Sequence, residues 1–267
     1  MAKGSAIRVG VGGWTYAPWR DNFFPKGLPQ SQELAYASRH LSAIEINGTY
    51  YRTQSPASFA KWRDETPVGF VFSAKASRYA TNQRVLADAG ESVERFVGSG
   101  LAELGDKLGP LVWQFMPTKK FDPEDFGAFL NLLPQSVGGL KLRHVMDVRH
   151  ESFMTPEYLK LARKHKVATV FADSDEYPSF ADLTGDFVYA RLMRTEAKVE
   201  TGYEERSLDR WVERAQAWAA GDQPADLPRV DSAATATKPR DVFLYFISGA
   251  KERAPAAAMA LIERLGT

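Results

Sequence analysis

Polar side chains interrupt the apolar runs of this sequence at three places. Glu45 lies between two isoleucines, Gln114 lies between a tryptophan and a phenylalanine, and Lys75 ends an apolar run. Burying such a group costs several kcal/mol unless partners satisfy it. We therefore expect Glu45, Lys75, Asp147 and Arg149 to satisfy one another in a buried network.

A network of this kind could carry acid–base chemistry. Coupled charges with shifted pKa values in a pocket are typical of catalytic sites. Glu45 or Asp147 could act as a general base, and Lys75 could act as a general acid or an electrostatic clamp. Two alternatives stay open: the network is structural polarity inside the fold, or Lys75 forms a Schiff base, which nothing in the sequence specifies.

Further basic residues point to an anionic ligand. Arg191 and Arg194 lie at the end of one apolar run, and Lys251 belongs to a Ser-Gly-Ala-Lys loop ahead of an Ala-rich segment. A glycine-containing loop before a helix offers backbone N–H groups to an anion. The predicted anion contacts are Lys75, Arg149, Arg191, Arg194 and Lys251. For the Lys251 loop, the alternative is an ordinary strand-to-helix connection.

Aromatic residues follow the first two apolar runs. Trp14, Tyr16 and Tyr50 could stack on a sugar or on an unstacked base. The alternative is that these rings only pack together and close one end of the fold. The remaining predicted substrate-binding residues are polar: Asn47, Gln114, His150 and Asp173.

The composition excludes several kinds of chemistry. The chain has no cysteine, which excludes disulfides, thiolate catalysis and Cys-bound zinc or iron–sulfur sites. We find neither a phosphate-binding P-loop nor a Ser-His-Asp signature. We predict no metal and no cofactor, with one alternative. A single hard divalent ion could be held by Glu45, Asp147, Asp173 and His150.

The charge balance is nearly neutral. There are 34 Lys and Arg residues against 33 Asp and Glu residues, so the net charge is +1. Bulk charge therefore provides no field for nucleic acid or for a membrane surface. No apolar stretch approaches the ~18 residues of a membrane span, and no secretory h-region precedes the first apolar run. We expect a soluble, cytoplasmic protein whose partner is an anionic small molecule; nucleic acid is not favoured, and no oligomeric state is predicted.

Strand-like and helix-like segments alternate along the chain. Eight short runs predict strands: Ile7–Gly13, Ala43–Asn47, Phe70–Lys75, Leu111–Phe115, His144–Val148, Ala168–Ala172, Phe187–Leu192 and Val242–Ile247. Six segments predict helices: Ser31–Leu41, Glu91–Leu104, Pro123–Leu133, Pro156–His165, Ser207–Ala220 and Pro255–Leu265. The stretch 173–186 has the composition of a loop.

This alternation predicts an α/β fold, a TIM-type (β/α)8 barrel that forms a single domain over residues 1–267. Residues 221–240 are expected to form a surface loop within it. A doubly wound sheet is the structural alternative, but Gly10-Val11-Gly12-Gly13 lacks the third spaced glycine of a dinucleotide fingerprint. In a barrel, the carboxyl ends of the strands form the active face, so the polar residues above should converge there.

The chain resembles the YecE-like family, known as domain of unknown function 72. The Glu-Ile-Asn…Tyr-Tyr and Arg-His-Glu-Ser-Phe motifs are the specific ones. The resemblance implies a TIM-type barrel and implies no particular reaction. The matching pieces span nearly the whole chain: Gly13–Tyr16 with Trp19, Ile44–Arg52, Phe70–Lys75, Lys107–Pro110 with Gln114, Asp147–Phe153 and Val188–Leu192.

Several positions depart from the family pattern. Asp147 stands where the family typically has Glu, and Asn82 follows Thr81 where the family often has His. Met193-Arg194 replaces a frequent His-Gly, and Ile247–Gly249 replaces Asn-Asn-Asp. The loss of two His and one Asp weakens a metal mechanism carried over by analogy. The basic residues Arg194 and Lys251 favour an anionic ligand instead.

Three functions follow as hypotheses. The leading one is an enzyme that acts on an anionic, phosphorylated or sugar-containing small molecule. Its expected reaction is that of a hydrolase of a phosphoester or glycosidic bond. Its candidate catalytic residues are Glu45, Lys75 and Asp147. The second is a nucleic-acid-binding or endonuclease-like barrel, in which aromatic residues stack on an extruded base. The third is a barrel that binds a ligand without catalysis.

Overall fold

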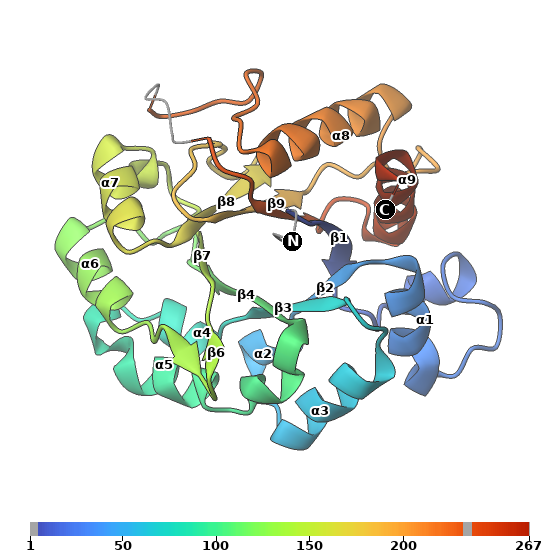
Figure 1. Cartoon of the computed structure of the whole chain (residues 1–267), viewed down its shortest axis with the longest axis horizontal. Coiled ribbons are helices and arrows are strands. Elements are labelled where there is room, and N and C mark those ends of the chain that lie inside the picture. The colour runs from blue at the N-terminus through green and yellow to red at the C-terminus, as the bar shows by residue number, and fades with distance from the viewer. Residues whose placement is uncertain (1–4, 232–236, 267) are drawn as a thin grey trace.

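The computed structural model describes residues 5–231 and 237–266 of the chain. Eight parallel strands close into a barrel in the order β1-β10-β9-β8-β7-β4-β3-β2, and Figure 1 shows the helices arranged outside them. The predicted TIM-type barrel is therefore confirmed, and the doubly wound alternative is wrong. The barrel strands are β1 (Ile7–Gly12), β2 (Ala43–Ile46), β3 (Val71–Lys75), β4 (Leu108–Gln114), β7 (His144–Asp147), β8 (Ala168–Asp173), β9 (Phe187–Leu192) and β10 (Asp241–Phe246).

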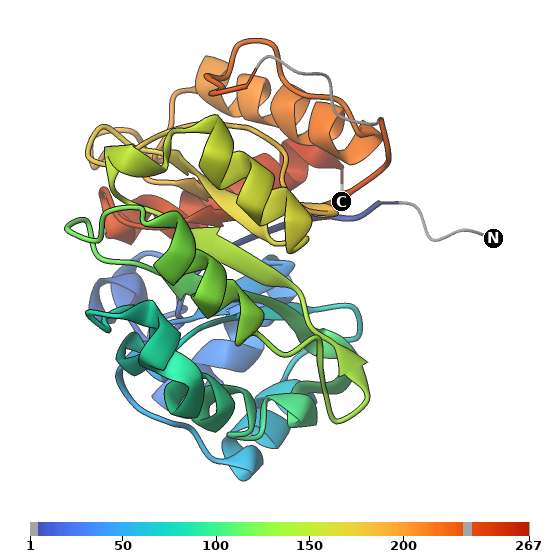
Figure 2. The same cartoon turned by 90° about the vertical axis from the view of Figure 1, so that its left-hand side faces the viewer.

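Helices cover the outside of the barrel, and Figure 2 shows them from the side. Two of them begin as their sequences predict, because the Asp122 and Thr155 side chains each accept a backbone N–H of the first turn and a proline follows. The helices are α1 (Glu33–His40), α2 (Gly48–Tyr51), α3 (Pro56–Glu65), α4 (Arg78–Thr81), α5 (Gly90–Val97), α6 (Pro123–Asn131), α7 (Pro156–Lys164), α8 (Glu205–Ala220) and α9 (Ala254–Leu265).

The predicted helix Glu91–Leu104 is confirmed at its start and wrong at its end. Helix α5 ends at Val97, and a separate 3₁₀ segment covers Leu101–Lys107. Gly100 between them has φ +116°, a left-handed conformation that breaks a right-handed helix. The structure also contains features that the sequence did not predict: helix α3 and a two-stranded antiparallel hairpin of β5 (Ser136–Val137) and β6 (Leu140–Lys141).

The glycines near the start of the chain are strand residues. Gly10 pairs with Ala43 of the neighbouring strand, and a Cβ atom there would lie 1.8 Å from the Ala43 carbonyl oxygen. Only glycine permits this close approach of β1 to β2. The Gly10–Gly13 segment thus serves the closure of the barrel.

The strand period of two places the polar residues in one layer. An apolar layer inside the barrel includes Ala43, Val71, Val112, Val145 and Tyr189. The side chain two residues further along each strand lies on the same face. It therefore also points into the barrel, one layer nearer the end formed by the carboxyl ends of the strands. Those positions are Glu45, Ser73, Gln114, Asp147 and Arg191.

Two long connections lack regular structure. No helix separates β8 from β9, which agrees with the loop predicted at 173–186. Within the predicted surface loop, the described residues 221–231 and 237–240 contain no helix or strand, while residues 232–236 lie outside the described residues. In the part of the chain that the structure describes, no helix has the length and apolar composition needed to cross a membrane.

Candidate functional site

A buried arginine occupies the centre of the polar layer. Arg191 Nη2 donates to both Glu45 oxygens at 2.8 and 2.7 Å, and its Nη1 donates to Asp147 Oδ2 at 2.5 Å. The three side chains are at most 4% exposed. Burial alone lowers the pKa of Arg191, but Glu45 and Asp147 more than offset this and the net shift is upward. Arg191 therefore stays positively charged, and the carboxylates of Glu45 and Asp147 balance its charge.

Two further side chains extend this centre toward the mouth of the barrel. Arg149 donates through Nε to Asp147 Oδ2 at 3.1 Å and through Nη2 to Gln114 Oε1 at 2.9 Å. The same amide oxygen accepts from Arg191 Nη1 at 3.0 Å. The Arg149 guanidinium also lies 4.3 Å from the centre of the Tyr177 ring. Asp147 and Gln114 thus hold the guanidinium groups of Arg149 and Arg191 side by side. We call the five residues of this network the polar centre: Glu45, Gln114, Asp147, Arg149 and Arg191.

Tyr189 supports the polar centre from the layer below. Its hydroxyl donates to Glu45 Oε2 at 2.6 Å and lies 3.1 Å from the Ser73 hydroxyl, which donates to the Pro110 carbonyl at 2.7 Å. Burial raises the pKa of Tyr189 well above its ordinary value, so the phenol keeps its proton. With Arg191 on the other side, both Glu45 oxygens are already hydrogen-bonded.

Lys75 lies beside the polar centre but is not ion-paired within it. Among the described residues, no carboxylate lies within ion-pair distance of its ammonium, which sits 4.6 Å from the centre of the Tyr50 ring. Burial and the nearby charge of Arg191 lower the pKa of Lys75 to about 8, and the carboxylates of Glu45 and Asp147 offset only part of this shift. The expected network therefore has a different centre: Arg191, rather than Lys75, satisfies the two carboxylates.

A cleft opens at the carboxyl ends of β1 and β2. It has a volume of about 310 Å³, and four of the predicted substrate-binding residues line it: Trp14, Tyr16, Asn47 and Lys251. The Lys251 ammonium lies 4.4 Å from the centre of the Tyr16 ring, and burial lowers its pKa. We call this the mouth cleft.

Three further residues that line the mouth cleft were not among the predicted site residues: Arg52, Gln54 and Trp62. Trp62 comes from α3 and packs edge-on against Trp14, with ring centres 5.1 Å apart. Arg52 directly follows the Tyr50-Tyr51 pair, and this position was the one available signal. The described residues that line the cleft include two cations, Arg52 and Lys251, and no carboxylate.

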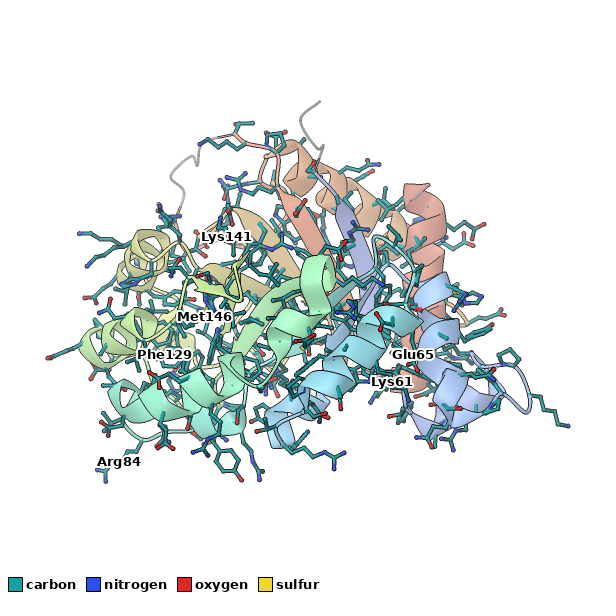
Figure 3. All side chains as sticks on the ribbon, turned by 60° about the horizontal axis from the view of Figure 1, so that its bottom comes forward. Lys61, Glu65, Arg84, Phe129, Lys141 and Met146 are labelled. Carbon is teal, nitrogen blue, oxygen red and sulfur yellow. The ribbon has the colours of Figure 1, made fainter. Side chains whose placement is uncertain are left out.

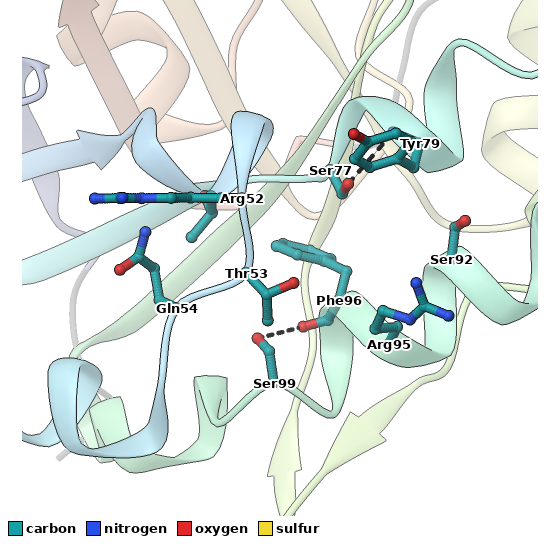
Figure 4. A pocket seen from close by; sticks show the side chains of 10 residues that line it. Arg52, Thr53, Gln54, Ser77, Tyr79, Ser92, Arg95, Phe96 and Ser99 are labelled. Atoms are coloured by element: carbon teal, nitrogen blue, oxygen red, sulfur yellow. Dashed lines mark hydrogen bonds between the residues drawn. The ribbon is translucent and has the colours of Figure 1, made fainter.

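Arg52 and Gln54 also border a smaller hollow of about 90 Å³, which Figure 4 shows. Hydroxyl groups from α5 and the loops around it line this hollow together with Arg95. Its Arg95 guanidinium is paired with Glu91 one helical turn away. The small hollow therefore offers polar contacts next to the mouth cleft and little volume of its own.

Asp173 and Arg194 form a separate cluster at the ends of β8 and β9. Tyr203 donates its hydroxyl proton to Asp173 Oδ2 at 2.9 Å, and Arg194 pairs with Asp175 at 2.8 Å. Burial raises the pKa of Asp173, and the hydrogen bond from Tyr203 opposes this shift. Half of the Arg194 side chain is exposed, so it remains accessible from solvent.

His150 holds a loop. Its Nδ1 accepts the Ser152 backbone N–H at 3.1 Å and thereby caps the 3₁₀ turn Glu151–Phe153; the same nitrogen lies 2.9 Å from the Ser152 hydroxyl. No group of three or more His, Asp or Glu side chains gathers as a metal site within the described residues. The four side chains of the divalent-ion alternative are therefore not brought together.

Comparison with known proteins adds relatives of low identity. One is the UPF0759 protein YunF of Bacillus subtilis, 24% identical over 157 residues, which are 57% of this chain and 54% of that protein. The chain thus spans about half the length of the curated relative that it matches.

The fold is shared with solved structures. A DUF72 family protein from Thermotoga maritima has a TM-score of 0.74 at 20% identity, covering 98% of this chain and 100% of that one. A DUF72 family protein from Enterococcus faecalis has a TM-score of 0.69 at 16% identity over 98% of each chain. The 3-keto-D-glucoside 4-epimerase of E. coli has a TM-score of 0.51 at 13% identity, covering 98% and 100%. A family model described as "Protein of unknown function DUF72" matches residues 8–267, and the chain therefore belongs to the DUF72 family.

Proposed function

We propose that this protein is an enzyme that acts on an anionic, phosphorylated or sugar-containing small molecule bound in the mouth cleft. The observation that carries the proposal is the lining of the cleft, where Arg52 and Lys251 stand among aromatic rings without an opposing carboxylate. Cations of this kind attract phosphate or carboxylate groups, and the faces of Trp and Tyr rings suit the apolar faces of sugars.

Residues that line the cleft are close to Glu45 of the polar centre, both along β2 and across to β1. Gly12, which lines the cleft, pairs in register with Glu45, and Asn47 of the cleft lies two residues beyond Glu45. A ligand in the cleft would therefore lie next to the layer that contains Glu45 and Arg191. Lys251 contacts the Tyr16 ring inside the cleft, and Lys75 ends β3, the strand beside β2, where it contacts the Tyr50 ring.

In this proposal, Lys75 performs the acid–base step. With a pKa of about 8, close to neutral pH, its amine can exchange a proton in both directions. Glu45 and Asp147 already accept hydrogen bonds from Arg191, so their role is to position and balance the charges. Hydrolysis of a phosphoester or a glycosidic bond is the reaction class to screen first. In this step water attacks the phosphorus or the anomeric carbon, Lys75 donates a proton to the leaving oxygen, and the proton released by the attacking water restores the Lys75 ammonium. The E. coli epimerase that shares this fold acts on a keto-glucoside, which adds sugars to the screen.

A ligand screen tests the proposal. Sugar phosphates, free sugars and phosphate esters are added to the wild type, Lys251→Gln and Lys75→Met, and both melting temperature and turnover are measured. We expect an anionic ligand to stabilise the wild type, Lys251→Gln to weaken its binding, and Lys75→Met to bind it without turnover. Binding with no turnover by the wild type would contradict the enzymatic part of the proposal and favour a non-catalytic ligand-binding barrel.

One observation favours a second candidate, nucleic-acid binding. Tyr51 and Tyr79 are 61% and 59% exposed at the rim, and the Arg78 guanidinium lies 5.9 and 5.4 Å from their ring centres. Exposed rings beside a cation can stack on the bases of a single strand. Titration with a single-stranded oligonucleotide at several salt concentrations tests this candidate. Affinity that falls steeply with salt and is lost in Tyr51→Ala would support it.

A further inference from the structure

A second hollow, larger than the mouth cleft, lies at the opposite end of the barrel. Its volume is about 560 Å³, within the ~300–1,000 Å³ typical of small-molecule sites. Segments that precede four neighbouring strands line it: residues 141–144, 163–166, 184–187 and 238–240. Because these segments lead into parallel strands, the hollow is at the amino-terminal end of the barrel. Lys141, labelled in Figure 3, stands on the β5–β6 hairpin at its edge.

We call this hollow the basal pocket, and its lining is strongly basic. Among the described residues, its lining includes six Lys or Arg residues and one acidic residue, Asp186. Asp186 pairs with Lys141 at 3.4 Å, and both side chains are largely exposed. Two of the arginines have carboxylate partners from outside the lining, Asp241 and Asp231. Lys166 and Lys238 form no ion pair with any described residue. The basal pocket therefore keeps an excess of positive charge after its internal pairs are formed.

Two of its cations are held rigidly. The Arg143 guanidinium lies 4.9 Å from the Phe243 ring centre and 5.6 Å from that of Phe187, and it donates to Asp241 at 2.8 Å. Arg240 is 8% exposed and donates to the carbonyl oxygens of Gly221 and Lys238 at 3.0 and 2.9 Å. Cations that are fixed before binding lose less conformational entropy when a ligand arrives.

Lys166 adds another amine to the basal pocket, although its backbone has a conformation that is unfavourable for lysine. It has φ +56° in the turn that ends α7, and only one other non-glycine residue in the described chain, Ser248, has a positive φ. Glycine is the residue that best suits this position after a helix. The turn thus carries a lysine at the pocket where glycine would be more stable.

We propose that the basal pocket binds a small molecule with two or more adjacent negative charges, of the kind found in a pyrophosphate or a phosphate ester. Lys166 and Lys238 would bind the anion directly, and Arg143 and Arg240 would supply fixed positive charge behind it. A concave pocket with rigid walls suits a small molecule better than an extended nucleic-acid strand. This site lies at the other end of the barrel from the mouth cleft and does not depend on the proposed function.

Pyrophosphate is a suitable probe, and calorimetric titration measures its binding to the whole protein. The variants are the double substitution Lys166→Gly with Lys238→Ser, the matched control Lys61→Gln on α3, and Lys251→Gln in the mouth cleft. We expect the double variant to bind roughly tenfold more weakly or worse, because it loses two charge-assisted contacts. Lys61→Gln should bind like the wild type. If pyrophosphate also enters the mouth cleft, Lys251→Gln removes that second site and leaves binding at the basal pocket unchanged. The melting temperature of Lys166→Gly should equal or exceed that of the wild type, since glycine relaxes the turn.

Hydrogen exchange provides a readout on the unaltered protein. Pyrophosphate should slow exchange of the backbone amides in residues 184–187, which line the basal pocket. Several results would overturn the proposal: no binding by the wild type, loss of binding in Lys251→Gln instead of the double variant, or an equal loss in Lys61→Gln. Binding of single-stranded oligonucleotides with an affinity that grows with strand length, and none of pyrophosphate, would replace it with a nucleic-acid surface.

Discussion

Arg191 Nη2 lies 2.7 Å from Glu45 Oε2, although 146 positions separate the two residues in the chain. The pair joins β9 to β2, which are not neighbours in the barrel, so the contact crosses the interior. Asp147 approaches the same guanidinium from β7. One arginine thus ties three strands together at the level where the barrel opens toward its mouth.

Removal of the Arg191 guanidinium should destabilise the fold strongly. Arg191→Met leaves two buried carboxylates without their cation, and loss of one partner of a buried ion pair costs about 3–5 kcal/mol. Urea unfolding measures the change. Arg194→Met is the matched control: Arg194 is half exposed, so its loss should cost less than about 1 kcal/mol. Equal effects in the two variants would contradict the central role of Arg191.

Loss of the Tyr189 hydroxyl should also destabilise the protein, by a smaller amount. This hydroxyl donates to Glu45 at 2.6 Å in a fully buried position. A hydrogen bond to a charged group contributes about 1.5–3 kcal/mol, and Tyr189→Phe should reduce the free energy of unfolding by about that amount. Tyr79→Phe, at a side chain that is 59% exposed, should change it little. A neutral result for Tyr189→Phe would mean that Glu45 does not need this donor.

Because of Lys75, the free energy of unfolding should rise with pH in the alkaline range. Its pKa falls from 10.5 to about 8 on folding, so between these values the unfolded chain binds more protons than the folded one. The free energy of unfolding therefore rises with pH across this window, by about 3 kcal/mol from this group. Lys75→Met should remove that rise and should be no less stable than the wild type near neutral pH. Urea unfolding of Lys75→Met at a series of pH values tests this prediction. If the free energy of unfolding of this variant still rises between pH 8 and 10.5, Lys75 is not the cause.

His144 should contribute to acid unfolding. The ring is buried between two hydrogen bonds: Nδ1 accepts from Trp113 Nε1 at 3.0 Å, and Nε2 lies 2.7 Å from the Pro134 carbonyl. Burial lowers the pKa of His144 from 6.5 to about 4, so the unfolded chain binds the extra proton between those values. Stability should therefore fall by about 3 kcal/mol as the pH drops through this window.

The matched comparison for this prediction is His144→Gln against His40→Gln, because the His40 ring is exposed on α1. His144→Gln should flatten the dependence of stability on pH between 4 and 6.5, whereas His40→Gln should leave it in place. An unchanged slope in His144→Gln would show that other groups control acid unfolding.

Local signals in the sequence were enough to predict the barrel strands, most of the longer helices and the type of fold. Runs rich in Val, Ile and Phe marked all eight barrel strands, and capping residues such as Asp122 and Thr155 marked helix starts, because these signals act over a few neighbouring residues. The polar residues inside strands were also visible, since a residue such as Glu45 between two isoleucines contradicts its apolar surroundings. The break after Val97 was missed because the glycines that cause it are also tolerated inside helices.

Which charges meet inside the barrel depends on how the whole chain is folded. Arg191 and Lys75 both come from strands that enter the same layer, and the stagger of the closed barrel places Arg191, not Lys75, between Glu45 and Asp147. That stagger depends on the packing of all eight strands together, so no local pattern encodes it. The same holds for the mouth cleft, where Trp62 comes from a helix that the sequence did not predict, and for the basal pocket, whose cations come from three separate segments of the chain.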